Sequence, residues 1–269
     1  MEQQHEEWIE KFARLGYLAK GIVYGTIGLL AVQAAFDTGG KTTGSQGALK
    51  SIAAQPFGKV LLVLLTFGLL GYVTWRFIQA VRDPEHRGHE ASDIFRRIGY
   101  AISGLFYASL AVSAGRILMS AGSNSDSGDS TAQSWTAKLM SQPYGRWLVG
   151  AVGLFIIGLG CYYIYRAIKA KFRKRMKLYQ MSNAEKTWAT WVGRFGIAAR
   201  GVVYAIIGAF TIQAALRFNP SQVKTSEGAL QSLENNPTDE WLLGIVAFGL
   251  IAYAIHMGFQ ARYRSIDPL

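Results

Sequence analysis

The stretch RLGYLAKGIVYG at residues 14–25 decides the fold, because it recurs twice further along the chain. It returns as RIGYAISGLFYA at residues 97–108 and as RFGIAARGVVYA at residues 194–205. Each copy opens a long apolar segment, and a second apolar segment follows each copy. Internal repeats of this length are typical of architectures built from one repeated supersecondary unit. The predicted units, each of two helices within a single membrane domain, span residues 14–82, 97–170 and 194–262.

The apolar segments are long enough to cross a membrane. Each has about 20 residues or more, which is the length a helix needs to span the hydrocarbon core. A soluble helix of this length would show a polar face, and stretches such as WLVGAVGLFIIGLG show none. Charged residues make up 17% of the chain, below the roughly 25% of soluble domains. We therefore expect an all-α integral membrane protein with six transmembrane helices, over residues 15–36, 57–81, 98–119, 147–168, 195–216 and 241–261.

The net charge of +11 is unevenly distributed, which predicts the orientation. Most of the 28 lysines and arginines fall on the side of the membrane that holds both termini. Cytoplasmic loops carry this excess, so the sequence predicts that both termini lie in the cytoplasm. The acidic, amphiphilic start MEQQHEEWIEK does not have the pattern of a cleavable signal peptide.

The densest basic run is KAKFRKRMK, just beyond the fourth apolar segment. One interpretation is a topology determinant that also attracts anionic lipid headgroups, and the other is a docking site for an acidic partner. Because the charge lies beside a membrane span, we do not expect nucleic acid as a partner. The residues predicted to meet headgroups are Lys169, Lys171, Arg173, Lys174 and Arg175.

Each repeat carries the same signature: an arginine, a glycine two residues later, another glycine seven residues later and a tyrosine ten residues later. Glycines let membrane helices approach closely, so the sequence predicts helix contacts at these positions. The arginines stand where the first helix of each repeat begins, and we expect them to snorkel to the headgroups. The signature residues are Arg14, Gly16, Gly21, Arg97, Gly99, Gly104, Arg194, Gly196 and Gly201.

Two spans per repeat make all three repeats point the same way, which predicts a pseudo-threefold axis along the membrane normal. The polar and aromatic candidates for lining this axis are Gln33, Gln213, Tyr24, Tyr107 and Tyr204. For the two glutamines, the alternative is an interhelical hydrogen bond worth about 1 kcal/mol. Lys20 and Arg200 lie inside their helices and either snorkel or line a positively charged cytoplasmic vestibule.

The three external connections also resemble one another. TTGSQGALKSIAAQPFG at residues 42–58 is similar to STAQSWTAKLMSQPYG at 130–145 and to TSEGALQSLENNPTDE at 225–240. Each combines helix-capping residues, a short amphipathic run and a proline. We expect one short interfacial helix in each connection, ended by its proline. The stretch at residues 122–130, GSNSDSGDS, reads as a flexible insertion of the middle repeat.

Motifs of known enzymes are absent from the sequence. It holds no Walker loop, no G-x-S-x-G and no HExxH, and the six apolar segments hold no Asp or Glu. We expect no enzymatic activity, no cofactor and no metal. His86 and His89 are the weak alternative for a metal site. His256 is either an interfacial residue hydrogen-bonded to a carbonyl or a pH-sensitive group, and the lone Cys161 allows no disulfide framework.

The threefold R-x-G-Y-x-x-x-G-x-x-Y pattern, with the G-A-L…P-F-G connection, resembles domain-of-unknown-function family 1206 over nearly the whole chain. The middle copy departs most, with Ser103 and Arg116 in place of a basic residue and a glutamine. The resemblance implies a bacterial integral membrane protein of six helices. It carries over no activity and no catalytic residue.

Two functions fit these observations. The first is a structural, accessory or lipid-organising membrane component, with a membrane protein partner or a second copy of the chain. The second is a channel or facilitator for a small solute or anion along the pseudo-threefold axis, where positive charge at the cytoplasmic mouth would favour anions.

Overall fold

The computed structural model describes residues 2–81, 91–119, 128–236 and 240–265, and all of its named elements are helices. Six helices in this part of the chain are long and apolar enough to cross a membrane, as predicted. Hydrophobic length sets their extent, although α1 begins well before its apolar stretch and α7 is extended by an N-terminal capping box at Ser182 and Glu185. The six are α1 (Glu2–Ala35), α3 (Gly58–Val81), α4 (Ala91–Met119), α6 (Gly145–Ile168), α7 (Asn183–Arg217) and α9 (Glu240–Tyr263).

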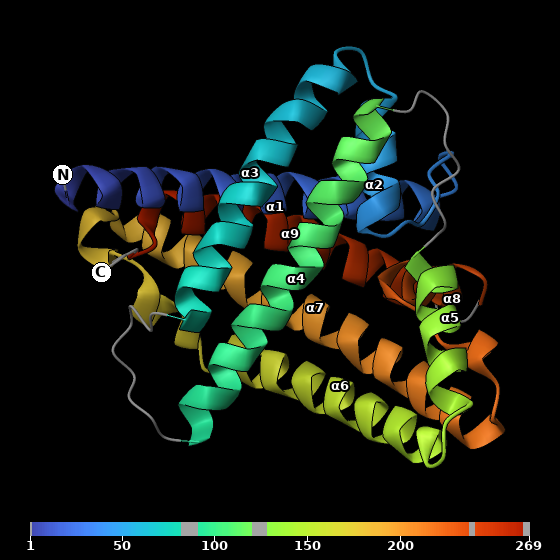
Figure 1. The fold of residues 1–269 in the computed structure, drawn as a ribbon. Helices are drawn as coiled ribbons and strands as arrows, with labels where there is room; N and C mark the ends of the chain where they lie inside the picture. The colour runs from blue at the N-terminus through green and yellow to red at the C-terminus, as the bar shows by residue number, and fades with distance from the viewer. Residues whose placement is uncertain (1, 82–90, 120–127, 237–239, 266–269) are drawn as a thin grey trace.

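The helices pack in a definite order. α1 packs against both α9 and α3, α3 against α4, and α7 against both α6 and α9. Figure 1 shows α1, α9, α7 and α6 side by side, with the α3–α4 pair inclined across them. The second helix of each repeat therefore packs on the first helix of the next repeat, and α9 closes back onto α1. Within a repeat, α1 packs on α3 and α7 on α9, but α4 has no comparable packing on α6.

Four of the signature glycines, Gly16, Gly21, Gly196 and Gly201, lie against the backbone of a neighbouring helix. The predicted helix contact is wrong at Gly99, where a Cβ would have no atom within 4 Å, and a Cβ on Gly104 would meet side chains first. A Cβ placed on Gly16 would lie 2.6 Å from the Tyr72 backbone nitrogen, and one on Gly196 would lie 2.4 Å from that of Tyr253. Across the repeat junctions, a Cβ on Gly201 would lie 2.8 Å from the Gly160 carbonyl oxygen. Any side chain would push these helices apart, which is why glycine suits these positions.

Three short helices lie at the end of the molecule opposite the start of α1 and the end of α9 (Figure 1). One occurs in each predicted connection, and each ends shortly before its proline. The turn that follows is the same in the first two repeats, since Phe57 and Tyr144 both have a positive φ, 60° and 64°. Most of the predicted insertion lies outside the described residues. The short helices are α2 (Ser45–Ala53), α5 (Gly128–Met140) and α8 (Ser226–Glu234).

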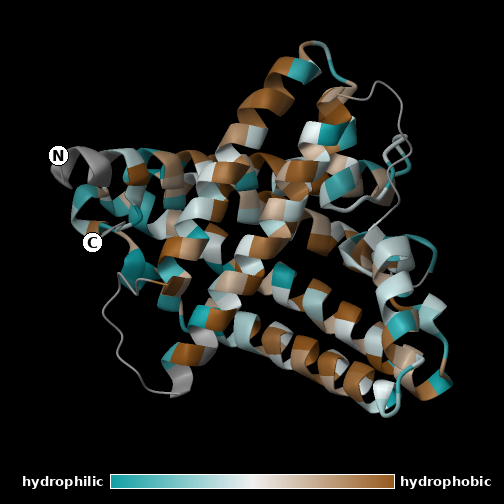
Figure 2. Ribbon diagram, in the orientation of Figure 1, coloured by the Kyte–Doolittle hydropathy of each residue, from teal (hydrophilic) through white to brown (hydrophobic). Residues whose placement is uncertain are grey.

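The outer surface of the long helices is apolar. Figure 2 shows hydrophobic residues along the outward sides of these helices and polar residues gathered mainly at their ends. Many large hydrophobic side chains remain exposed, α6 having the most open surface. Apolar patches of this extent are unusual on soluble monomers and require another apolar medium. The six apolar helices thus fit a multi-pass membrane protein. Examples of these exposed side chains are Leu29, Leu64, Leu105, Leu154 and Phe248.

Candidate functional site

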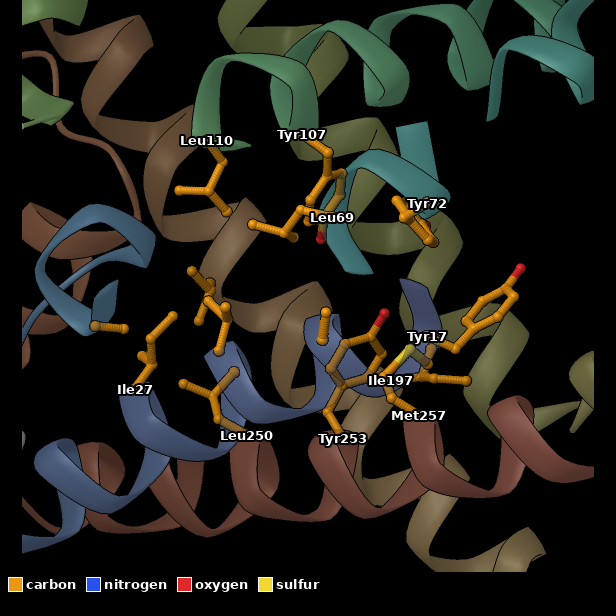
Figure 3. Close-up of a cluster of buried hydrophobic side chains, with 14 of the residues drawn as sticks. Tyr17, Ile27, Leu69, Tyr72, Tyr107, Leu110, Ile197, Leu250, Tyr253 and Met257 are labelled. Carbon is orange, nitrogen blue, oxygen red and sulfur yellow. The ribbon is translucent and has the colours of Figure 1, made fainter. Parts of the chain in front are cut away.

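Three positively charged side chains meet a group of tyrosines in the interior of the helix bundle. Lys20, Arg76 and Arg200, with the tyrosines around them, form what we term the cationic cluster. Lys20 and Arg200 lie near the middle of α1 and α7 and are buried. The snorkelling alternative is therefore wrong for these two residues, because their charged ends contact tyrosines inside the protein. Figure 3 shows Tyr107 and Tyr253 pointing into this interior from α4 and α9.

Lys20 is held by tyrosines from three different helices. Its Nζ donates a hydrogen bond of 3.0 Å to the hydroxyl oxygen of Tyr72 on α3. The same nitrogen lies 4.8 Å from the ring centroid of Tyr72, 4.9 Å from that of Tyr107 and 5.7 Å from that of Tyr253. Ring faces at these distances stabilise a cation electrostatically.

Arg200 has a similar environment. Its Nη1 donates to the hydroxyl of Tyr253 at 2.5 Å and its Nη2 to the hydroxyl of Tyr204 at 2.7 Å. The guanidinium carbon also lies 4.9 Å from the ring centroid of Tyr24 and 5.2 Å from that of Tyr163. Four tyrosines from α1, α6, α7 and α9 thus surround this one cation.

The hydrogen bond between Lys20 and Tyr72 in the first repeat corresponds to the one between Arg200 and Tyr253 in the third repeat. The bonds to Tyr72 and to Tyr253 both run from a basic residue of a first helix to the corresponding tyrosine of the second helix. In the middle repeat the corresponding residues are Ser103 and Tyr162, and Tyr162 is exposed. The middle repeat therefore contributes no cation of this kind to the cluster.

Arg76 completes the cluster on α3. Its Nε donates to the hydroxyl of Tyr72 at 2.8 Å, so this oxygen accepts from both Lys20 and Arg76. Its Nη1 donates to Oε1 of Gln79 at 2.8 Å, and its guanidinium carbon lies 5.1 Å from the ring centroid of Tyr100. One tyrosine oxygen thus holds two positive charges near each other.

The charges of the cluster are not balanced by carboxylates. Among the described residues, the hydrogen-bond partners of its three cations are tyrosine hydroxyls and one amide oxygen. Buried charges are costly unless opposite charge or strong hydrogen bonds compensate them, and in membrane helices they mark functional sites. A tyrosine hydroxyl can also donate a hydrogen bond, so the cluster offers both charge and donors to an anion.

The predicted axial residues separate into two groups. Tyr24, Tyr107 and Tyr204 all lie in the cationic cluster. Gln33 is exposed and Gln213 half-buried, and neither contacts the cluster. Each glutamine follows the basic residue of its helix by 13 positions, or about 20 Å along the axis, so both lie toward the opposite end.

Four residues of the cluster are not predicted as site residues from the sequence: Tyr72, Tyr253, Tyr163 and Arg76. The signal for the first two was present, because a tyrosine recurs at this position in the second helix of every repeat. Tyr163 and Arg76 have no such threefold signal. Their roles depend on how helices from different repeats pack.

Two of the three arginines that open the repeats, Arg14 and Arg97, bind helix ends. Arg14 Nη1 donates to the carbonyl oxygens of Ala261 and Arg262 at the end of α9. Arg97 binds two carbonyl oxygens at the end of α3, both at 2.7 Å. The last carbonyls of a helix lack intrahelical donors and carry partial negative charge, so an arginine suits them. Snorkelling of these arginines to headgroups stays a prediction, and Arg194 makes no such carbonyl contact in the described structure.

His256 is buried in the helix bundle, in the last two turns of α9. Its Nε2 lies 3.2 Å from Nε2 of Gln260, and its ring centroid lies 4.8 Å from that of Phe172. A side-chain amide thus takes the place of the predicted carbonyl partner. The pH sensitivity of His256 stays a prediction.

The basic run is fixed against the end of α9. Phe172, in the 3-10 helix η1 (Lys171–Arg175), is fully buried, and the Lys177 backbone nitrogen donates to the Tyr263 carbonyl at 2.7 Å. Arg175 is half-buried and donates to the hydroxyl of Tyr100 at 3.2 Å. Contact with lipid headgroups stays a prediction. The exposed basic residues of the run are Lys169, Lys171, Arg173 and Lys174.

Metal ligands do not gather in the part of the chain that the structure describes. No group of three or more His, Cys, Asp or Glu that could hold a metal ion occurs there. His86 and His89 lie outside the described residues. Cys161 is exposed on α6.

Comparison with known proteins places the chain in a family. The family described as Domain of Unknown Function (DUF1206) matches residues 15–83, 98–170 and 195–264, which are the three repeats. The chain is 32% identical over 266 residues to "Uncharacterized protein YxxB" of Bacillus subtilis (strain 168), covering 99% of this chain and 95% of that protein. No solved structure matches the chain. With all three of its repeats matched and a relative aligned along nearly its full length, the chain belongs to the DUF1206 family.

Proposed function

We propose that this protein binds an anion at the cationic cluster and lets it pass or exchange across the bacterial inner membrane. The observation that carries the proposal is the burial of Lys20 and Arg200 among tyrosines, with no carboxylate partner in the part of the chain that the structure describes. Inside a membrane protein the effective dielectric is low, so attraction between these cations and an anion is stronger than in water. In this proposal the protein is not an enzyme.

The proposed orientation places both termini in the cytoplasm. The distribution of lysine and arginine supports it, and the first residues of α1 lie at the same end of the molecule as the last residues of α9 (Figure 1). The cluster then lies in the cytoplasmic half of the bundle, since Arg76 is only five residues before the end of α3 at Val81.

A pseudo-threefold arrangement of the repeats is part of this proposal. Its support is the recurrence of one packing contact at all three repeat junctions, α3 with α4, α6 with α7 and α9 with α1. Tyr24, Tyr107 and Tyr204 occupy corresponding positions in the three first helices and all reach the cluster. The axis would therefore pass near the cations.

Anion flux into liposomes that hold the purified full chain tests the proposal. We expect selective flux of one or more of chloride, inorganic phosphate and small carboxylates, and little cation flux. Lys20→Gln and Arg200→Gln should each abolish it, while Lys20→Arg, which keeps the charge, should retain part of it. Gln33→Leu is the matched control, because Gln33 is exposed and lies outside the cluster.

Binding should be measured independently of flux. The same anion should raise the thermal unfolding temperature of the purified protein, and Lys20→Gln should remove this shift. If no anion in the panel stabilises the protein or crosses the membrane above empty liposomes, the proposal is wrong.

The open surface of α6 favours a second function, that of an accessory protein. Its side chains Trp147, Leu154 and Phe155 are all more than three-fifths exposed, and among the long helices it packs extensively only on α7. We propose that a membrane protein partner or a second copy of the chain covers this surface. Size measurement in mild detergent, with and without Phe155→Ser, tests this alternative.

A further inference from the structure

The packing within the middle repeat is open. In the other two repeats, a glycine of the second helix touches the first helix: a Cβ on Gly68 would lie 2.7 Å from an alanine Cβ, and one on Gly249 would lie 2.2 Å from another. The corresponding Gly158 of α6 has no atom within 4 Å of such a Cβ, and neither has Gly99 of α4. A close contact made twice in this fold is therefore missing between α4 and α6.

One residue of α4 accounts for the difference. The alanines that touch Gly68 and Gly249 are Ala19 and Ala199, and the middle repeat has Ile102 in their place. A Cβ already meets these glycines closely, so an isoleucine side chain would not fit between the helices. Ile102 is 56% exposed, whereas both alanines are buried.

The facing side of α6 is exposed in the same way. Phe155 is 65% exposed, although its counterparts Leu65 and Val246 are 3% and 1% exposed. Tyr162 is 46% exposed, while the tyrosines at its position in the other repeats are buried. We term these two exposed apolar sides, of α4 and of α6, the α4–α6 seam. Its exposed side chains are Ile102, Phe106, Val152, Phe155 and Tyr162.

The cationic cluster lies behind this seam. Tyr107 comes from α4, and its ring lies 4.9 Å from Lys20 Nζ. Tyr163 comes from α6, and its ring lies 5.2 Å from the Arg200 guanidinium. Each side of the seam thus supplies one tyrosine to the cluster, and a molecule between the two sides would adjoin both cations.

We propose that an anionic phospholipid enters the α4–α6 seam from the membrane and places its phosphate on the cationic cluster. This inference rests on the proposed anion-binding function and names the chemical class of the anion. The phosphate complements Lys20 and Arg200, which have no carboxylate partner among the described residues. The apolar side chains of the seam can pack against acyl chains, whereas a small hydrated anion has no apolar surface to pack against them.

The depth of the cluster is compatible with this ligand. Lys20 lies six residues beyond Arg14 on α1, or about 9 Å along the helix axis. Arg14 binds the end of α9 and therefore marks the level at which that helix ends. A headgroup must move inward by only this distance while its acyl chains remain between the apolar sides of the seam.

Photolabelling of the full chain in phosphatidylcholine nanodiscs tests the inference. The probes are phosphatidylglycerol and phosphatidylcholine that carry the same photoreactive acyl chain. We expect phosphatidylglycerol to label the peptides that contain Ile102–Phe106 and Phe155–Tyr162. The double variant Lys20→Gln, Arg200→Gln should lower this labelling about tenfold, as loss of a charge-assisted hydrogen bond predicts, and should leave phosphatidylcholine labelling unchanged.

Blocking the seam gives a second, independent variant. Ile102→Trp should reduce phosphatidylglycerol labelling of the α6 peptide, because the larger ring fills the entry. Val112→Trp is the matched control on the same helix. Val112 is also 56% exposed, but its counterpart Leu29 is equally exposed, so this position faces lipid in another repeat as well.

The outcomes separate this inference from the proposed function. If inorganic phosphate stabilises the protein through Lys20 but the two lipids label the seam equally, lipid entry is wrong and anion binding stands. If neither phosphate nor phosphatidylglycerol depends on Lys20, both are wrong. Thermal unfolding and gel filtration of each variant verify that it is folded. Replacing Lys20 by arginine instead of glutamine keeps the charge and should restore phosphatidylglycerol labelling.

Discussion

At the scale of single residues, the same glycine has different consequences in different repeats. Gly16 and Gly196 lie against the backbone of a neighbouring helix, while Gly99 has open space around it. The signature residues are identical in the three sequences, so these glycines differ through their neighbours, Ile102 among them, and through the packing of the second helix.

Gly16→Ala should destabilise the protein, because its Cβ would lie 2.6 Å from the Tyr72 backbone. Overpacking of this kind costs about 1–3 kcal/mol. Gly99→Ala should instead stabilise α4 by up to about 1 kcal/mol, the difference in helix propensity between the two residues. Thermal unfolding in detergent followed by tryptophan fluorescence measures both, and equal effects at the two positions would contradict the open packing of the middle repeat.

The arginines that begin each repeat offer a second contrast. Arg97→Gln should lower the unfolding free energy by about 1–3 kcal/mol, since it removes charged hydrogen bonds to Ala80 and Val81 at the end of α3. Arg194→Gln should have a smaller effect, because its Nε is buried without a hydrogen-bond partner among the described residues. Chemical or thermal unfolding of the two variants side by side measures this. A larger loss for Arg194→Gln would show that arginine capping is not the main role of these residues.

At the scale of helices, the sequence predicts most of what the structure contains. Hydrophobic length is sufficient to place six spans and three short connecting helices, because both depend on local composition and on proline. Which helices pack together depends on pairs of side chains far apart in sequence, and the repeat pattern does not specify it. A clue was nevertheless present, since Ile102 replaces an alanine that the other two repeats share.

Ile102→Ala should let α4 and α6 pair. In the first repeat, a Cβ on Gly16 would lie 2.6 Å from the Tyr72 Cβ, so the corresponding positions 99 and 162 would come close on pairing. We expect Gly99→Ala to become destabilising only when Ile102→Ala is added, because a Cβ at position 99 would then meet Tyr162. Thermal unfolding of the single and double variants measures this coupling. Val112→Ala in place of Ile102→Ala serves as the control, and a destabilising Gly99→Ala without Ile102→Ala would mean that the helices pair already.

At the scale of the whole molecule, contacts between the short helices join repeats far apart in sequence. Asp129 of α5 accepts a hydrogen bond of 2.7 Å from the Thr225 backbone nitrogen at the start of α8. Glu227 of α8 is half-buried beside it. Burial raises the pKa of the Glu227 carboxyl above its ordinary value, and the charge of Asp129 raises it further.

A pH dependence of stability follows from Glu227. The folded protein holds the proton of this carboxyl more tightly than the unfolded chain does. The unfolding free energy should therefore fall as the pH rises from about 4.3, the ordinary value for glutamate, through the raised pKa. Glu227→Gln carries no charge and should raise the unfolding temperature at pH 7 but not at pH 4. Unfolding temperatures measured across this range test it, and a variant less stable than the parent at pH 7 would contradict it.

The candidate site could be predicted only in part, because it depends on contacts between repeats that the sequence pattern does not specify. Tyr24, Tyr107 and Tyr204 are visible as a threefold repeat, and they do meet the cluster. Gln33 recurs only as Gln213, since the middle repeat has Arg116 there, and it lies too far along its helix to reach the cluster. Tyr163 belongs to no threefold pattern, and only the packing of α6 on α7 brings it to Arg200. Distance along a helix and contacts between repeats are the two quantities that a repeat pattern leaves open.

The natural isoleucine at position 102, where the other two repeats have alanine, also bears on how such a chain could arise. Three identical helical hairpins assembled as separate subunits would carry the same residue at the contact between their two helices. One mutation would therefore open this contact in all three hairpins or in none. Once gene duplication and fusion had joined the hairpins in one polypeptide, each copy could diverge alone. A single large side chain could then open the contact between the two helices of one hairpin, while the same contact in the other two hairpins kept the assembly together.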